Sequence, residues 1–62
     1  MSAGQKIRKL RGSRTAAECA VAVGITRSSW VKYERGERVP RDDMKKKIAQ
    51  FLGVSVQDIF FS

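Results

Sequence analysis

The stretch from residue 15 to residue 36, TAAECAVAVGITRSSWVKYERG, contains two helix-start signals and two helix-stop signals. Thr15, with a glutamate three positions later, has the capping-box pattern, and Thr26 is a second N-cap residue. Gly24 and Gly36 can adopt the left-handed conformation that commonly ends a helix. Two short helices joined by so short a glycine-containing link favour a steep helix-turn-helix crossing over about residues 15–35.

Helical signals continue on both sides of this stretch. Ile7 and Leu10 share one face of a segment over residues 3–11, and apolar residues repeat at helical spacing over residues 44–52. Ser55 has the position of an N-cap residue for a last short helix. No segment has the convincing alternation of a strand. The sequence therefore predicts an all-α fold, a compact bundle of five short helices that contains the helix-turn-helix.

The length and composition restrict the class of protein. A chain of 62 residues and 7.0 kDa is long enough for a single domain, which we expect to span residues 1–62. With no histidine and one cysteine, Cys19, it cannot form a histidine–cysteine metal site, a Cys–His catalytic pair or an internal disulfide. No metal ion and no cofactor are therefore expected. The Cys19 thiol is expected to be buried and inert.

The charge balance indicates a polyanionic partner. Thirteen Lys and Arg residues against six Asp and Glu residues give a formal charge of +7 and an isoelectric point near 10.4. So large a positive charge on a small domain favours nucleic acid or an acidic membrane surface. No apolar run approaches the roughly 18 residues that cross a bilayer, and the N-terminus lacks a signal-peptide core, so we expect a cytoplasmic location.

The second helix of the pair separates apolar from polar residues. Trp30 and Tyr33 form an inward stripe that we expect to pack in the core rather than to stack on bases. Hydrogen-bonding side chains lie off this stripe and concentrate in the N-terminal half, the part that enters the major groove in helix-turn-helix proteins. These side chains are Arg27, Ser28, Ser29 and Lys32.

Several motifs, in register along nearly the whole chain, resemble the Cro/CI-type (Xre) helix-turn-helix domain of phage repressors. The most specific are the Ala20/Gly24 pair followed by Ile-Thr, the sequence YERG at residues 33–36, and LGVS at residues 52–55. The resemblance implies a five-helix DNA-binding domain that regulates transcription, usually as a dimer, in a bacterial or phage context.

The resemblance also implies roles for individual residues. The base-facing positions correspond to Arg27, Ser28 and Lys32, with Ser29 beside them. The phosphate-facing positions, at the start of the first helix of the pair and in the loop after the second, correspond to Thr15, Ala16, Arg35, Arg38 and Arg41. Arg11 and Glu34 occupy places at which the family often forms an ion pair. Ala16 departs from the family, which commonly has a glutamine there that braces a phosphate.

The C-terminal residues indicate a self-association surface. On a helix, Val56, Ile59 and Phe60 share one face, whereas Phe61 points about 100° away from Phe60. So small a core has little room for both rings, and an exposed aromatic patch is typical of an interface. The predicted dimer interface therefore comprises Val56, Ile59, Phe60 and Phe61. The alternative is that Phe61 folds back over the edge of the domain.

Together these features predict a sequence-specific transcriptional regulator that binds double-stranded DNA, in the form of a repressor that binds a pseudo-palindromic operator as a homodimer. Neither a small-molecule ligand nor a membrane is expected as a partner. The alternative function is a protein-interaction module, such as the antitoxin half of a toxin–antitoxin pair. Catalysis is not expected, because the chain contains no histidine, metal-ligand cluster or nucleophile–base pair.

Overall fold

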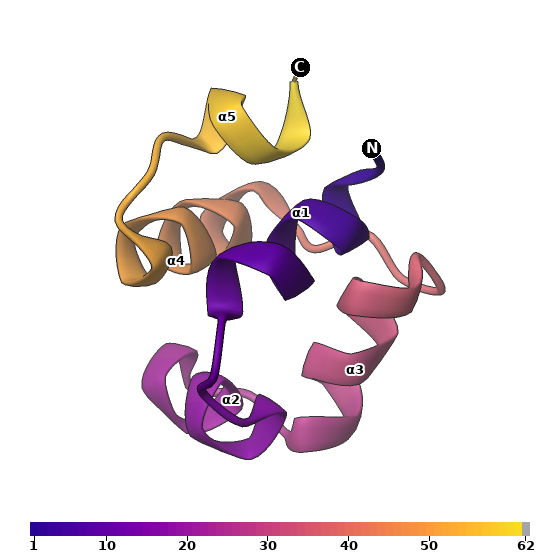
Figure 1. Ribbon diagram of the computed structural model, residues 1–62, viewed down its shortest axis with the longest axis vertical. Coiled ribbons are helices and arrows are strands. Elements are labelled where there is room, and N and C mark those ends of the chain that lie inside the picture. Colours follow the sequence, from indigo (N-terminus) through magenta and orange to yellow (C-terminus); the bar gives the residue numbers. More distant parts are fainter. Residues whose placement is uncertain (62) are drawn as a thin grey trace.

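A computed structural model describes residues 1–61, and these residues form five α-helices and no strand. The helices are α1 (Ala3–Arg11), α2 (Ala16–Val23), α3 (Arg27–Arg35), α4 (Asp42–Leu52) and α5 (Val56–Phe60). Figure 1 shows α2 and α3 meeting at one end of the molecule and α5 at the other end. The prediction of an all-α bundle that contains a helix-turn-helix is confirmed.

A threonine is the N-cap residue of each helix in the central pair, α2 and α3. The Thr15 hydroxyl accepts a hydrogen bond from the Glu18 amide at 3.1 Å, and the Thr26 hydroxyl accepts one from the Ser29 amide at the same distance. Gly24 follows α2 with a φ of 78°, in the left-handed region where a Cβ atom is strained, and it turns the chain toward α3. These caps pair amide and carbonyl groups that the helices themselves leave without partners.

Two capping details differ from the predictions. The capping box at Thr15 and Glu18 is half formed, because the described residues show no return bond from the Glu18 carboxylate to the Thr15 amide. Complete boxes instead join the residue pairs that begin α5 and α1, which are Ser55 with Asp58 and Ser2 with Gln5. The cap at Ser55 agrees with the prediction, whereas no cap was predicted for α1.

The core is built around Trp30, whose side chain is completely buried. Its ring meets the Phe51 ring of α4 edge to face, with centroids 6.4 Å apart and planes at 86°, which is a favourable geometry for two aromatic rings. The other buried apolar side chains come from all five helices: Ile7, Ala16, Cys19, Ala20, Val23, Tyr33, Ile48, Ala49 and Ile59. The predicted core positions of Trp30, Tyr33 and Cys19 are confirmed.

Gly4 allows the backbone of α1 to pack directly against the end of α3. A Cβ atom at this position would lie 2.7 Å from the Tyr33 carbonyl oxygen and closer still to that of Glu34. Cβ atoms do not approach backbone oxygens so closely, so a larger residue would force the two helices apart. This contact sets how near α1 lies to the C-terminal turn of α3.

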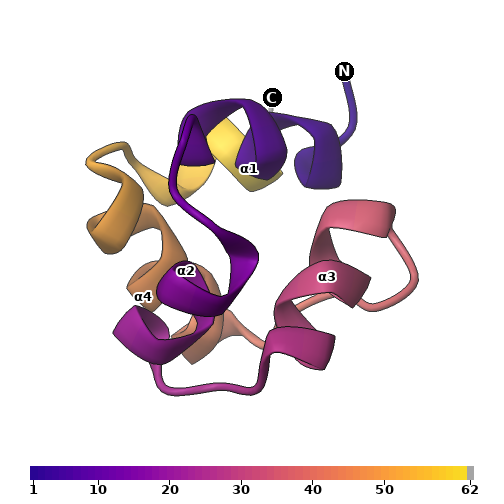
Figure 2. The same ribbon diagram turned by 60° about the horizontal axis from the view of Figure 1, so that its bottom comes forward.

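The N-terminus and α5 lie at the end of the molecule away from the α2–α3 turn in both views (Figures 1 and 2). There α5 packs against α1 and α4. The longest helix within residues 1–61 is α4, with 11 residues, and none of the helices described is long and apolar enough to cross a membrane. The α2–α3 turn and the outer side of α3 are left uncovered by this arrangement.

Candidate nucleic-acid interface

The polar side chains of α3 lie on the side opposite the core. Ser28 and Lys32 are each two positions from the buried Trp30, which places both about 160° from it around the helix. Ser28 and Arg27 are exposed, and Lys32 is partly exposed. Within residues 1–61 none of these three side chains makes a hydrogen bond or an ion pair. Their donors are therefore free for an external partner such as a base edge.

A hollow of about 510 Å³ lies between α3, α1 and the start of α2. Four arginines line it, and these are Arg8, Arg11, Arg27 and Arg35. The rest of the lining consists of Val31 and Glu34 of α3, the N-cap residue Thr15, and Ala16 at the start of α2. Guanidinium groups beside a helix N-terminus have the chemistry of a phosphate site. The structure thus brings Thr15, Ala16 and Arg35, predicted to face phosphates, together with Arg27, predicted to face bases.

Arg8 is a member of this cluster that the sequence analysis missed. It is exposed and lies one helical turn before Arg11 on α1, so the two side chains share a face. The i, i+3 spacing of these arginines is a signal in the sequence. Only the packing of α1 against α3 shows that this face is turned toward the helix-turn-helix.

The start of α2 contributes backbone groups to the hollow. The Thr15 hydroxyl is engaged as the N-cap of α2, and the Ala16 methyl group packs in the core with 8% of the residue exposed. The first amides of a helix have no partner within the helix, so those of Ala16 and Ala17 remain available. Ala16 can therefore face a phosphate through its amide and not through its side chain.

Glu34 joins α3 to α1 at the edge of the hollow. Its Oε2 lies 2.9 Å from Arg11 Nε, and the Trp30 indole N–H donates to the same oxygen. The Arg11 and Glu34 side chains are 20% and 10% exposed, so both charges are largely removed from water. The Arg11 Nε–H is not aligned for a hydrogen bond, so the contact is ionic, while Arg11 Nη1 donates to the Arg14 carbonyl oxygen at 3.2 Å.

The ion pair of Arg11 and Glu34 agrees with the prediction, whereas the participation of Trp30 was not predicted. Burying an indole N–H requires an acceptor, and Glu34 is one turn after Trp30 on the same side of α3. One carboxylate therefore accepts a hydrogen bond from a core aromatic residue and forms an ion pair with an arginine of α1. This arrangement fixes the orientation of the carboxylate from two directions.

The loop after α3 carries the other residues predicted to face phosphates. Arg38 and Arg41 are exposed and line a second hollow on the opposite flank of α3. Arg41 is the N-cap residue of α4 but makes no capping bond with its side chain. Arg38 Nη1 donates to the Ser29 hydroxyl at 3.4 Å. Arg35, at the end of α3, lies 3.7 Å from the Glu37 carboxylate in an exposed ion pair that offsets part of its charge.

The C-terminal residues form the predicted self-association surface only in part. Ile59 is 1% exposed and packs in the core, so its place in the predicted interface is wrong. Phe61 lies beyond the end of α5, so the helical offset of 100° does not apply to it. The Lys45 ammonium is 5.4 Å from the Phe60 ring centroid and 5.1 Å from that of Phe61, and thus contacts both rings. Phe61 folds back toward α4 in this way but remains 60% exposed.

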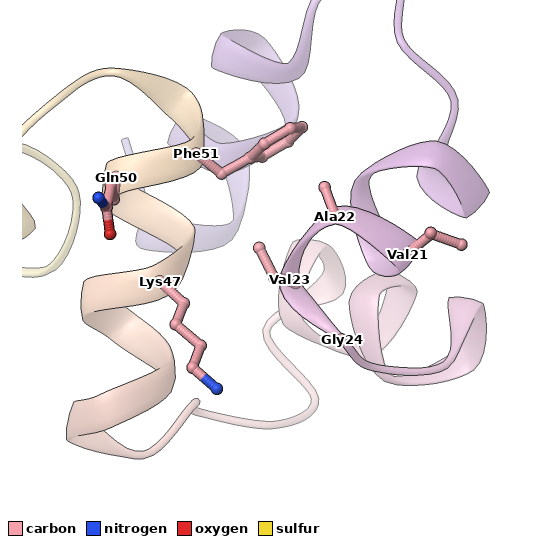
Figure 3. Close-up of a pocket in the computed structure, with 7 residues that line it drawn as sticks. All are labelled: Val21, Ala22, Val23, Gly24, Lys47, Gln50 and Phe51. Atoms are coloured by element: carbon pink, nitrogen blue, oxygen red, sulfur yellow. The ribbon is translucent and has the colours of Figure 1, made fainter.

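A mainly apolar hollow of about 490 Å³ lies between α2 and α4, and none of the residues predicted to contact DNA lines it (Figure 3). Phe51 reaches from α4 toward α2, and Lys47 is the charged residue in the lining of the hollow.

Within residues 1–61 no group of three or more His, Cys, Asp or Glu side chains is placed to hold a metal ion. Burial raises the pKa of the Cys19 thiol, which keeps it protonated and unreactive near neutral pH.

A helix-turn-helix whose second helix carries free polar side chains defines a class of nucleic-acid-binding domain. Residues 2–59 match the family model described as helix-turn-helix domain, and the chain belongs to this family. This membership places it among binding proteins rather than enzymes.

The chain is also similar to the cryptic phage CTXphi transcriptional repressor RstR of Vibrio cholerae, with 32% identity over 56 residues. The match covers 87% of this chain and 50% of the relative, so the chain spans about half the length of that protein. No solved structure matches significantly. The resemblance to phage repressors is confirmed.

Proposed function

We propose that residues 1–62 act as one domain that binds duplex DNA sequence-specifically and represses transcription in the bacterial cytoplasm. The free polar side of α3 carries this proposal, because Arg27, Ser28 and Lys32 have no partner within the described residues while the opposite side of the helix is locked in the core. Similarity to a protein named as a phage transcriptional repressor supports the regulatory role. The formal charge of +7 supports attraction to phosphates.

In this proposal the N-terminal half of α3 enters the major groove. Arg27 and Lys32 donate to acceptors such as guanine O6 and N7, and the Ser28 hydroxyl donates or accepts beside them. Specificity comes from these contacts, because each base pair presents a different pattern of donors and acceptors in that groove.

Phosphate contacts on both flanks of α3 set the position of the helix in the groove. On one flank, the amides at the start of α2 bind a backbone phosphate together with Arg8 and Arg35 of the 510 Å³ hollow. On the other flank, Arg38 and Arg41 bind a second phosphate. These contacts supply affinity that is independent of sequence.

The domain is further proposed to bind as a homodimer through its C-terminal end. Phe61 is exposed there and Val56 and Phe60 are partly exposed, at the end of the molecule opposite the α2–α3 turn (Figure 1). Two copies joined at this end leave both α3 helices free. A two-fold axis between them implies a pseudo-palindromic operator with half-sites about 34 Å apart.

Selection of bound fragments from random duplexes, at two salt concentrations, tests sequence-specific binding. Arg27→Ala and Lys32→Ala should each lose about 1–3 kcal/mol of discrimination at one base pair, whereas Arg41→Ala should weaken all sequences alike. Lys46→Ala, which removes an exposed cation of α4, is the matched control and should keep the same preference. Equal binding of selected and scrambled duplexes by the wild-type domain would contradict the proposal.

Sedimentation velocity tests the proposed dimer. Phe61→Asp should give monomers, because a charge in the centre of an apolar contact loses its hydration. Val21→Asp is the control, since Val21 is 79% exposed on α2, far from the C-terminal end. Dimers that persist in Phe61→Asp would rule out this interface, and co-purification of a second polypeptide would favour the protein-interaction module instead.

A further inference from the structure

Ser29 connects the first turn of α3 to the loop that follows the helix. Its hydroxyl oxygen accepts hydrogen bonds from the Thr26 hydroxyl at 3.0 Å and from Arg38 Nη1 at 3.4 Å. The Ser29 amide donates in return to the Thr26 hydroxyl at 3.1 Å. The acceptor capacity of the Ser29 oxygen is thus used within the domain, by residues on both sides of it in the sequence.

The place of Ser29 on α3 also separates it from the base-facing residues. Ser29 lies about 100° from Ser28 and about 100° from the buried Trp30 around the helix, on the flank that carries Tyr33. Ser29 is partly buried, whereas Ser28 is exposed. Tyr33 and Arg38 line one hollow on this flank. Ser29 therefore faces the loop rather than the side of α3 opposite the core.

Arg38 depends on Ser29 for its position. Within residues 1–61 the bond to the Ser29 hydroxyl is the one hydrogen bond or ion pair of the Arg38 side chain. The neighbouring acid Glu37 pairs with Arg35 instead. A guanidinium group has five N–H donors, so the bond to Ser29 leaves the others available for a phosphate. The contact restrains Arg38, and because the acceptor is a neutral hydroxyl, the guanidinium charge is not neutralised.

We propose that Ser29 is a positioning residue that holds the Arg38 guanidinium beside the first turn of α3, so that the phosphate contact of the loop and the base-facing residues meet DNA in one register. This inference rests on the proposed function. The sequence predicted that Ser29 lies beside the base-facing residues. In the present proposal Ser29 acts through Arg38 instead. A guanidinium restrained before binding loses less conformational freedom on binding, which raises affinity for every sequence.

The restraint is tested first without DNA. In the ¹⁵N-labelled domain, the heteronuclear NOE of the Arg38 Nε–Hε group reports its motion on the picosecond-to-nanosecond timescale. Ser29→Ala should lower this NOE, and Ser29→Thr, which keeps a hydroxyl, should preserve it. Ser28→Ala is the matched control on the outer side of α3 and should leave it unchanged. An Arg38 NOE that is the same in Ser29→Ala and in the wild type would overturn the proposal.

The consequence for binding is tested by a double-mutant cycle on a duplex selected by the wild-type domain. Arg38→Ala should reduce the slope of log K against log salt by about 0.9, the effect of one phosphate contact, on selected and scrambled duplexes alike. Ser29→Ala should weaken binding about two- to tenfold, the equivalent of one hydrogen bond, without a change in base preference. The double variant should bind no more weakly than Arg38→Ala, because both substitutions remove the same contact.

A base-reading role of Ser29 gives the opposite result. Ser29→Ala would then change the preference at one base pair, and its effect would add to that of Arg38→Ala. Thermal unfolding of each variant separates these outcomes from a loss of the helix cap, since the Ser29 amide keeps its bond to Thr26 in Ser29→Ala. A wild-type domain without any sequence preference would overturn the proposed function, and the NOE of Arg38 would still decide whether Ser29 restrains it.

Discussion

The inner and outer sides of α3 differ in almost every physical respect although they belong to the same nine residues. On the inner side, Trp30 is completely buried and Glu34 accepts from its indole N–H while it pairs with Arg11. On the outer side, Ser28 and Lys32 have no partner within the described residues. One side therefore stabilises the domain and the other is free for binding. Substitutions on the two sides should separate stability from recognition.

The largest effect is expected for Trp30→Ala. Truncation of a buried tryptophan leaves a cavity and costs about 3–5 kcal/mol, comparable with the entire stability of a domain of this size. The Glu34 carboxylate would also lose the hydrogen bond from the indole N–H. Circular dichroism at 25 °C should show a largely unfolded chain, and Trp30→Phe should remain folded with a lower unfolding midpoint. A fully folded Trp30→Ala domain would mean that the core does not depend on this ring.

The next effect is expected for Gly4→Ala, which places a Cβ atom against the Tyr33 and Glu34 carbonyl oxygens. Because the atoms in contact are backbone, α1 must move away from α3, at a cost of about 1–3 kcal/mol. This loss outweighs the better helix propensity of alanine. Urea unfolding measures it, with Lys9→Ala on the exposed side of α1 as control. A more stable Gly4→Ala domain would show that α1 does not approach α3 this closely.

A smaller effect is expected for Glu34→Gln, which keeps an oxygen for the Trp30 indole and removes the charge opposite Arg11. The partial exposure of Arg11 limits the loss to about 1–2 kcal/mol. Arg11→Gln combined with Glu34→Gln should cost less than the sum of the single changes, because the pair is then removed as a unit. Additive losses in chemical unfolding would show that the two side chains do not interact.

The smallest effect on stability is expected for Lys32→Ala, on the outer side of α3. The side chain makes no hydrogen bond or ion pair within the described part of the chain, so its removal should change the unfolding free energy by less than about 0.5 kcal/mol. The same substitution is expected to alter base preference. A marked loss of stability with unaltered DNA recognition would reverse the assignment of the two sides.

The helices could be predicted closely from the sequence because their start and stop signals are local. Thr15, Thr26 and Ser55 cap the amides three residues later, and Gly24 ends α2 in the left-handed conformation expected of it. The inward stripe of Trp30 followed from helical periodicity in the same way. These features depend on neighbours within a few positions, so the sequence order alone contains them.

The site was less predictable because its contacts join distant segments. Ile59 was expected at an interface and lies in the core, since the helical face that it shares with Phe60 is turned partly toward the other helices. Arg14 lies over the Phe51 ring, with its guanidinium carbon 4.7 Å from the ring centroid. Neither the burial of Ile59 nor the contact of Arg14 with Phe51 follows from the spacing of residues along a single helix.

The sequence by itself determined the five helices, the side of α3 that is buried, and the positive charge that favours a polyanion. Tertiary structure alone decided that Gly4 meets the end of α3, that Trp30 and Arg11 share the Glu34 carboxylate, and that Arg38 donates to the Ser29 hydroxyl. The physical reason is the range of the forces involved. Capping and periodicity act within a few residues, whereas packing and hydrogen bonding between helices depend on how the whole core closes.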